Sequence, residues 1–530
     1  MIARPSIGQA LKAVGLGAGV LNAGAALLQP AQSKKLGKKI AVEFHGQKVT
    51  YDQLERRSNQ FANACVAAGL KPNDRIALML LDRPEFVYAF IGAMKAGLVP
   101  IAVNNRAVAS EFAYILDDAQ AKMVVSEDYF TDVRRAAVTL AKADPQVVLL
   151  NEDKSLSGFL DGQKEKFQPA PRTRDDMAFW SYSSGSTGRP KGVVHAQGTI
   201  LAADRYLNEI LEAGPDDRLF SSSKLFFAFT LGHILIGGLR ACATIVLYEG
   251  WPDPEKVTEV VERHRPTIMF SVPTFFKKLL KSGAVGAPVY QLVKTYVAAG
   301  ESLPPSIFRQ WQGVTGHAIL EGIGSTETMF MFIANRKGEE MQGVTGRPSP
   351  GVEVRLIDHT GQTVEEPGLP GVLWVRMAGV AREYWNMPQK SAEVFNNGWF
   401  CTGDLFVLDG NGFFYHQGRA DDMVKVSGQW VSPVEIERRI EDDKAVLEAA
   451  VVGVPDRDGL TRLACFLVPV QGQTDRGALE AGLLESLTSL LPIYKCPRRF
   501  IFLDELPRTS SGKIQRFKLR QLAADQVNAR

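Results

Sequence analysis

Helix-like and strand-like segments alternate over the first part of the chain. In the first unit, Thr50 and Gln53 have the spacing of a helix capping box, an amphipathic helix follows, and Gly69 ends it. Residues 76–81 then form an apolar run with the length of a buried strand. The same order repeats, with further strands predicted at 99–103, 178–182, 267–272, 295–299 and 318–323. This alternation is typical of a parallel sheet covered by helices, so we predict an α/β fold.

The later part of the chain has two different patterns. From about residue 343, short alternating strands are predicted at 353–357, 372–377 and 413–415, separated by turns. After residue 418, Ser432 and Glu435 have the spacing of a second capping box. A helix is predicted at 477–490, with strands at 448–454, 463–470 and 499–503. We therefore predict a large N-terminal domain, 1–420, with a β-rich subdomain, and a small mobile α+β domain, 421–530.

Composition excludes several classes of protein. The net charge of +3 comes from 61 basic and 58 acidic residues, so no general affinity for nucleic acid is expected. The five cysteines are odd in number and lack CxxC spacing, which favours reduced thiols and argues against a zinc site. The apolar stretch 13–28 is glycine-rich and contains Asn22, which favours an arm or helix lying on the protein over a signal peptide. No other stretch approaches the ~20 apolar residues of a membrane span, so a soluble cytoplasmic protein is predicted.

The most unusual stretch, at 181–195, reads SYSSGSTGRPKGVVH. It follows a predicted strand, a position at which strand-to-helix connections bind phosphate. Its hydroxyls and open amides can surround a polyphosphate, and Lys191 can supply positive charge. A Walker A loop needs a glycine five positions after Gly185, where this chain has Pro190, so a P-loop NTPase is disfavoured. A flexible surface loop is the alternative interpretation.

The order of residues in this loop resembles the signature loop of the adenylate-forming superfamily. That superfamily comprises acyl- and aryl-CoA ligases, adenylation domains of peptide synthetases, and luciferases. Each further motif is weak alone, but all stand in the family's order, so the resemblance extends over nearly the whole chain from about residue 40. These motifs are GIGSTE at 322–327, TGD at 402–404, GRADDMVKVSG at 418–428 and PRTSSGKIQR at 507–516.

The resemblance implies a site for ATP and Mg²⁺. It assigns Glu327 to the metal ion, Thr326 to the α-phosphate, and Lys513 to both the substrate carboxylate and the α-phosphate, so these three are the expected catalytic residues. Asp404, with Arg419 beside it, matches the acid that binds both ribose hydroxyls, since a carboxylate has two acceptor oxygens. The other nucleotide contacts are expected from the phosphate loop and from two segments near the adenine: Ser183, Ser184, Gly185, Ser186, Thr187, Gly188, Lys191, Gly300, Glu301, Ser302, Glu321, Gly322 and Ile323.

The implied reaction has two steps. A carboxylate attacks ATP, pyrophosphate leaves, and coenzyme A then displaces AMP from the acyl-adenylate. Mg²⁺ and a lysine must offset the repulsion between the two anions of the first step. Because Lys513 is needed only there, relatives rotate the small domain between steps. Asp421 matches their hinge residue, and Ser427 and Gly428 match the stretch that lines the tunnel for the pantetheine arm of coenzyme A.

Within the superfamily, the chain most resembles the benzoate–CoA ligase branch. Ile323 stands where many relatives carry tyrosine, and DDMVKVSGQWVSP and KLFFAFTLGH are also similar to that branch. Benzoate ligases tend to carry Tyr-Gly-Leu-Gly-Asn where this chain has Phe-Thr-Leu-Gly-His at 229–233, which favours another compact ring acid: a substituted benzoate, a heteroaromatic or an alicyclic acid. Ordinary core packing is the alternative for these phenylalanines and for His233, and His195 is interpreted as structural. The expected acid pocket consists of Phe226, Phe227, Ala228, Phe229, His233 and Gly324.

The sequence therefore predicts an ATP-dependent ligase that joins a ring carboxylic acid to coenzyme A, releasing AMP and pyrophosphate. Three alternatives stay open: a short- or medium-chain fatty acyl-CoA ligase, an adenylation enzyme that loads a separate carrier protein, and a non-catalytic nucleotide-binding relative. Glu327, Asp404, Arg419 and Lys513 are all present, which disfavours the last. The expected partners are the acid, ATP and coenzyme A, with a possible homodimer.

Overall fold

The structure, a computed structural model, describes residues 19–150, 156–183, 189–456, 459–470, 475–508 and 514–528. Its first large sheet has seven strands. The strands from β7 through β4, β3 and β5 to β6 are parallel, whereas β8 and β18 are antiparallel additions at one edge. In spatial order the strands are β18 (Glu383–Tyr384), β8 (Lys191–Ala196), β7 (Met177–Ser183), β4 (Val99–Ala102), β3 (Arg75–Met79), β5 (Met123–Ser126) and β6 (Gln146–Leu149).

The second large sheet has nine strands, and its interior is also parallel. Antiparallel strands lie at both edges of this sheet, whereas the first sheet has them at one edge only. The predicted parallel α/β fold is thus confirmed for the interior of both sheets, and the edges differ from it. In spatial order the strands are β15 (Arg347–Pro348), β14 (Met331–Ala334), β13 (Ile319–Gly324), β12 (Thr295–Ala298), β11 (Ile268–Ser271), β9 (Arg218–Ser221), β10 (Thr244–Val246), β1 (Ile40–Phe44) and β2 (Gln47–Thr50).

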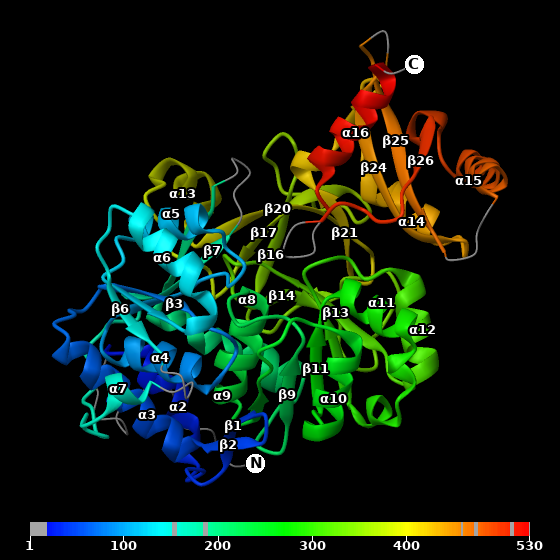
Figure 1. The fold of residues 1–530 in the computed structure, drawn as a ribbon. Coiled ribbons are helices and arrows are strands. Elements are labelled where there is room, and N and C mark those ends of the chain that lie inside the picture. The colour runs from blue at the N-terminus through cyan, green and yellow to red at the C-terminus, as the bar shows by residue number, and fades with distance from the viewer. Residues whose placement is uncertain are drawn as a thin grey trace.

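Helices cover both sheets (Figure 1). One buried apolar cluster contains residues of both sheets. Thr50 caps the helix that follows β2 as predicted, with both halves of the capping box present. The predicted N-terminal arm is a helix from Ala23 onward, capped by Asn22 and largely buried. The helices are α2 (Ala23–Ser33), α3 (Tyr51–Ala67), α4 (Pro84–Lys95), α5 (Ala109–Ala119), α6 (Thr131–Leu140), α7 (Ser157–Leu160), α8 (Ala228–Thr230), α9 (Gly238–Arg240), α10 (Pro254–His264), α11 (Pro273–Ser282) and α12 (Pro305–Thr315), with π-helices η3 (Arg205–Ile210) and η4 (Leu231–Gly237).

A smaller five-stranded antiparallel sheet forms the β-rich subdomain. Its core contains Phe406 and Phe414 and continues into β14 through Phe332, so the subdomain packs on the edge of the nine-stranded sheet. Its elements are β16 (Glu353–Ile357), β17 (Pro370–Arg376), α13 (Pro388–Val394), β19 (Phe395–Asn396), β20 (Trp399–Leu408) and β21 (Phe414–Arg419).

The chain after β21 forms separate sheets with separate apolar clusters, and in Figure 1 these elements lie together above the rest of the molecule. Ser432 caps α14 by accepting from the Glu435 amide, but the Glu435 carboxylate pairs with Lys495 instead of returning to the cap, so only half of the predicted capping box forms. The division at 420/421 stays a prediction. The elements are η7 (Ala420–Asp422), β22 (Val424–Val426), β23 (Gln429–Val431), α14 (Pro433–Glu441), β24 (Val446–Pro455), β25 (Thr461–Pro469), α15 (Arg476–Leu490), β26 (Arg499–Phe502) and α16 (Arg516–Asn528).

The serine- and glycine-rich loop joins two strands, β7 and β8, which pair antiparallel. The expectation of a strand-to-helix connection is therefore wrong. The β-branched Val193 and Val194 that follow the loop favour a strand, and both are buried there. Among the helices of the described ranges, none combines the length and apolar character that a membrane crossing requires.

Candidate active site

Glu327 is the point at which three segments of the chain meet. It follows β13, while Lys191 begins β8 and Tyr384 ends β18. The Lys191 Nζ lies 3.1 Å from Glu327 Oε1, and the Tyr384 hydroxyl donates to the same oxygen at 2.8 Å. Lys191 also lies 3.9 Å from the centre of the Tyr384 ring. The edge strands of one sheet thus hold a carboxylate that extends from the other.

The surroundings of Glu327 keep it ionised. Burial alone would raise the pKa of this carboxyl, but the Lys191 charge and the Tyr384 hydrogen bond outweigh burial and lower the pKa below its usual value. A buried carboxylate with one oxygen already oriented suits a hard divalent cation. Among the described residues, no group of three or more His, Cys, Asp or Glu side chains is arranged to hold a metal. A Mg²⁺ ion that arrives with a nucleotide would fit beside the Glu327 carboxylate.

Thr326 is held by its backbone. His195 on β8 donates from Nε2 to the Thr326 carbonyl at 2.8 Å. The imidazole is buried and stacks on Phe179, with ring centroids 4.9 Å apart. Burial lowers the pKa of His195 to about 4, so the ring is neutral near pH 7. His195 therefore fixes the backbone of the loop that carries Thr326 and Glu327.

The two glycines of the preceding strand allow close backbone packing. A Cβ on Gly322 would lie 2.3 Å from the Met331 sulfur, and one on Gly324 would lie 2.8 Å from the Phe330 carbonyl oxygen. Ile323 between them pairs with Ile333 of β14. Side chains at these two positions would clash with β14, so the glycines allow the close pairing of β13 and β14 directly before Thr326 and Glu327.

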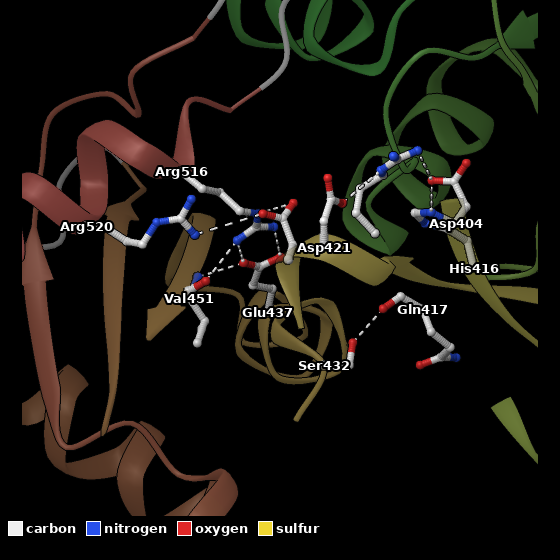
Figure 2. A network of polar contacts seen from close by, with 11 residues as sticks. Asp404, His416, Gln417, Asp421, Ser432, Glu437, Val451, Arg516 and Arg520 are labelled. Atoms are coloured by element: carbon white, nitrogen blue, oxygen red, sulfur yellow. Dashed lines mark hydrogen bonds and ion pairs between the residues drawn. The ribbon is translucent and has the colours of Figure 1, made fainter. Parts of the chain in front are cut away.

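Asp404 and Arg419 are partners across β20 and β21. His416 Nε2 lies 3.3 Å from Asp404 Oδ1, and Arg419 Nη1 lies 3.6 Å from the same oxygen (Figure 2). Gly403 has φ +73°, and a Cβ there would lie 2.7 Å from an Arg419 nitrogen. The TGD motif thus places an acidic acceptor and a guanidinium side by side, as expected for a group that binds hydroxyls.

Two buried carboxyls lie on the adenine side of the expected site. Glu301 follows Gly300, which has φ +91°, and burial raises the pKa of Glu301 although Arg508 and Thr274 oppose the effect. Burial also raises the pKa of Glu321 to about 7, although the charge of Arg438 on α14 and a hydrogen bond from the Leu303 amide oppose the effect. Ser302 follows Glu301 in the chain and is exposed.

Two charged residues of the C-terminal part of the chain contact two charged residues on this side of the site. Arg508 lies 3.6 Å from Glu301 and 3.0 Å from Glu448 of β24, and Lys277 of α11 lies 2.7 Å from the same Glu448. We call Lys277, Glu301, Glu448 and Arg508 the interdomain cluster. Arg508 precedes Lys513 by five residues, so the segment leading to the expected catalytic lysine is anchored beside the nucleotide segment.

The expected hinge residue lies between two polar networks. Asp421 accepts from Arg419 Nε at 3.2 Å, and on its other side Arg516 makes two hydrogen bonds to Glu437, at 2.5 and 2.9 Å (Figure 2). Burial would lower the pKa of Arg516, but Glu437 and Asp422 outweigh it and raise the pKa above its usual value. Ser427 and Gly428 form the turn between β22 and β23 and have φ values of +49° and +82°.

The expected acid pocket is an aromatic cluster. The Phe226 and Phe227 rings lie 4.2 Å apart, and the Phe229 ring lies 5.4 Å from the His233 ring. Phe227, Ala228 and Phe229 are partly exposed, whereas Phe226 and His233 are buried. Phe330, whose carbonyl packs against Gly324, lies 5.6 Å from His233. The fold thus brings all of the predicted pocket residues to one region beside the Thr326–Glu327 loop.

Some predicted site residues lie outside the described residues, namely Ser184–Gly188 of the phosphate loop and Lys513. The structure also adds residues that sequence reasoning did not select: Tyr384, His416 and Arg508. Tyr384 is separated from Glu327 by 57 positions and lies in no motif recognised above. Arg508 stands inside a quoted motif, but only the fold brings it to Glu301.

Comparison with known proteins gives a consistent family. The model of the AMP-binding enzyme family matches residues 30–385, and the model of the AMP-binding enzyme C-terminal domain matches 435–513. A 3-hydroxybenzoate–CoA ligase from Aromatoleum sp. (strain CIB) is 40% identical, over 95% of this chain and 97% of the relative. A benzoate–CoA ligase from Thauera aromatica is also 40% identical, over 91% of this chain and 92% of the relative.

Solved structures agree. The anthranilate CoA ligase AuaEII in complex with anthranoyl-AMP superposes with a TM-score of 0.89 at 32% identity, covering 97% of this chain and 99% of that one. A benzoate CoA ligase from Burkholderia xenovorans LB400 superposes with a TM-score of 0.86 at 34% identity, covering 94% and 99% of the two chains. The chain therefore belongs to the AMP-binding enzyme family, as an AMP-forming acid–thiol ligase of its benzoate–CoA ligase branch.

Proposed function

We propose that this ligase acts on an aromatic acid of the benzoate class and that the residues described above carry out its two half-reactions. The observation that supports this most directly is the Glu327 carboxylate, held by Lys191 and Tyr384 next to an aromatic cluster. The named relatives act on benzoate, hydroxybenzoate and anthranilate. A compact ring attached to a carboxylate suits both the cluster and these relatives.

In the first half-reaction, a carboxylate oxygen of the acid attacks the α-phosphorus of ATP, and pyrophosphate leaves. A Mg²⁺ ion bound with the nucleotide would supply charge that offsets the repulsion between the two anions. Glu327 would hold that ion, and Lys191 adds a fixed positive charge at the same place. Lys513 is proposed to bridge the carboxylate and the α-phosphate. Preorganised charge of this kind typically contributes about 10²–10³-fold in rate per group.

The nucleotide itself is proposed to be held at its two ends. Asp404, supported by His416 and Arg419, would accept hydrogen bonds from the two ribose hydroxyls. The 300–302 segment and Glu321–Ile323 would line the base. The backbone of Thr326, fixed by His195, would place its side chain against the α-phosphate.

In the second half-reaction, the thiol sulfur of coenzyme A attacks the acyl carbon, AMP leaves, and the thiol proton is lost to solvent. Lys513 must first leave the site, and we propose that residues 421–530 rotate about Asp421 to allow this. The turn at Ser427 and Gly428 would then face the site, where the small turn residues leave space for the pantetheine arm. We propose that the reaction takes place in the cytoplasm, which supplies ATP and coenzyme A, and the five unpaired cysteines support a reducing compartment.

The experiment that tests this function is a substrate panel. Purified protein would be incubated with ATP, Mg²⁺, coenzyme A and benzoates, alicyclic acids or linear acids of six to ten carbons, while AMP, pyrophosphate and thioester are measured. We expect benzoates to give the highest kcat/KM and equal amounts of AMP and thioester. A linear acid that exceeds every ring acid would contradict the proposal. Adenylate formation without thioester would point instead to a separate acyl acceptor.

A further inference from the structure

His233 lies at the inner end of the aromatic cluster. It stands in η4, one turn after Phe229, and its side chain is buried. Its ring lies between Phe229, Phe270 of β11, Phe330 and Tyr206 of η3, with centroid separations from 5.1 to 5.8 Å. Phe229 belongs to the expected acid pocket and is partly exposed, and Phe330 packs against Gly324 of that pocket. His233 therefore forms part of the floor of that region.

The hydrogen bond of His233 fixes its tautomer. Nδ1 lies 2.8 Å from the Phe229 carbonyl oxygen, and a carbonyl can only accept, so Nδ1 carries the proton. Burial lowers the pKa of His233 to about 4, so the ring is neutral near pH 7. Nε2 then presents a lone pair and no proton. Nε2 is buried and has no hydrogen-bond partner among the described residues.

A second buried polar atom, on a ring that packs against His233, also lacks a partner among the described residues. The Tyr206 hydroxyl is buried and likewise finds no hydrogen-bond partner in the described part of the chain. Burial raises the pKa of Tyr206, so it keeps its proton and can donate. The Tyr206 and His233 rings meet edge to face, 5.1 Å apart. Because buried polar groups in folded proteins nearly always have partners, an acceptor and a donor on two rings in contact suit a ligand group that can pair with both.

We propose that His233 and Tyr206 bind a hydroxyl group on the ring of the acid, so that this ligase is selective for hydroxybenzoates. The hydroxyl would donate its proton to His233 Nε2, and its oxygen would accept from the Tyr206 hydroxyl. An unsubstituted ring leaves both protein groups unpaired, as do methyl and chloro substituents. A methoxy group accepts but cannot donate, and the nitrogen of an arylamine donates but is a poor acceptor. This inference rests on the proposed function, since it assumes an aromatic acid in the cluster.

The test compares acids of nearly equal size. For the wild type, kcat/KM would be measured with benzoate and with the 2-, 3- and 4-isomers of hydroxy-, methyl- and methoxybenzoate. At one ring position we expect the hydroxyl to be favoured over methyl by about 10- to 100-fold, the range for leaving a buried polar group unpaired. The readout is this hydroxyl-to-methyl ratio, which a general loss of stability does not change.

Variants then show how much each of the two side chains contributes to the hydroxyl-to-methyl ratio. His233→Leu should bring the ratio to about 1 or invert it, by lowering the hydroxybenzoate value and raising the methylbenzoate value. His233→Gln places an amide oxygen near the position of Nε2 and should recover part of the ratio. Tyr206→Phe keeps the ring and should lower the ratio by a smaller factor. His317→Leu, which removes a surface histidine bonded to the Gln291 carbonyl, should leave the ratio unchanged.

The outcomes separate the two proposals. If no benzoate is activated, the proposed function fails. If benzoates are activated but the hydroxyl-to-methyl ratio is near 1 at every ring position, the function stands and the inference fails. The inference also fails if His233→Leu lowers kcat/KM equally for all acids. Should His233→Leu not fold, as judged by thermal melting, then an unchanged ratio in both His233→Gln and Tyr206→Phe overturns the inference.

Discussion

Replacing Arg508 by methionine tests whether the interdomain cluster holds the C-terminal part in the pose for the first half-reaction. The change removes the only charge that joins Glu301 to Glu448 within the cluster, while keeping most of the apolar length of the side chain. Glu301 and Glu448 are 14% and 17% exposed, so water replaces the lost contacts poorly. Glu301 keeps its hydrogen bond from Thr274 and Glu448 keeps Lys277, so each carboxylate loses one charged contact, and the loss of a charged contact in such a place costs about 1–3 kcal/mol.

That cost applies only to the pose in which Arg508 reaches Glu301. The equilibrium between poses should therefore shift against the first half-reaction by about 5- to 100-fold, since about 1.4 kcal/mol is a factor of ten. Adenylation should slow by up to this factor. Thioester formation from preformed acyl-adenylate should be unchanged or faster, because its pose does not need the cluster.

Pyrophosphate exchange measures the first half-reaction, and rapid-quench transfer from synthetic acyl-adenylate to coenzyme A measures the second. Arg462→Met is a matched control, because Arg462 is as exposed as Arg508, at 23%, and pairs with Asp456 inside the C-terminal part. The control should leave the ratio of the two rates unchanged. Equal slowing of both half-reactions in Arg508→Met would refute a pose-specific role for the cluster.

Four further outcomes are expected. Lys513→Ala should abolish adenylation yet spare transfer from preformed acyl-adenylate; equal losses would mean that the lysine acts throughout the cycle. Asp421→Pro fixes φ near −65° and removes an amide donor, so thioester formation should fall in the same transfer assay while pyrophosphate exchange persists. Phe227→Ala should lower kcat/KM for ring acids by about ten-fold and leave KM for ATP unchanged. A ten-fold rise in KM for ATP would mean that Phe227 does not belong to the acid pocket. Tyr384→Phe removes a hydrogen bond that lowers the pKa of Glu327, so the acid limb of the adenylation pH profile should move to higher pH, and an unmoved limb would show that Glu327 does not set it.

Local sequence signals predicted the interior of the fold well. The capping box at Thr50 and Gln53, the apolar runs that became β3 and β4, and the glycine that ends α3 each depend on neighbours in sequence. The edge strands of the sheets were harder to predict, because the partner of an edge strand can come from anywhere in the chain. β18 joins β8 although nearly 200 residues separate them, and the valines of β8 favour a strand without identifying the strand that pairs with it.

The candidate site also combines residues that local sequence identifies with residues that only the fold brings together. Motif residues such as Glu327 and Asp404 could be selected because their spacing is local and resembles a known family. Tyr384 could not, because its importance comes from one hydrogen bond across two sheets. The unpaired Nε2 of His233 was also beyond the sequence, since it depends on the Phe229 carbonyl taking the proton of the other ring nitrogen.

The buried carboxyl of Glu321 has a consequence for how the enzyme handles protons. Its pKa is about 7 while Arg438, carried by the C-terminal part, opposes the effect of burial. A rotation that takes Arg438 away while Glu321 stays buried would raise this pKa further, so that the carboxyl takes up a proton near neutral pH. Domain rotation and proton uptake are then thermodynamically linked, and the balance between the two poses shifts toward the rotated one as the pH falls. Each catalytic cycle would bind and release a proton at a residue that takes no part in the chemistry of the acid.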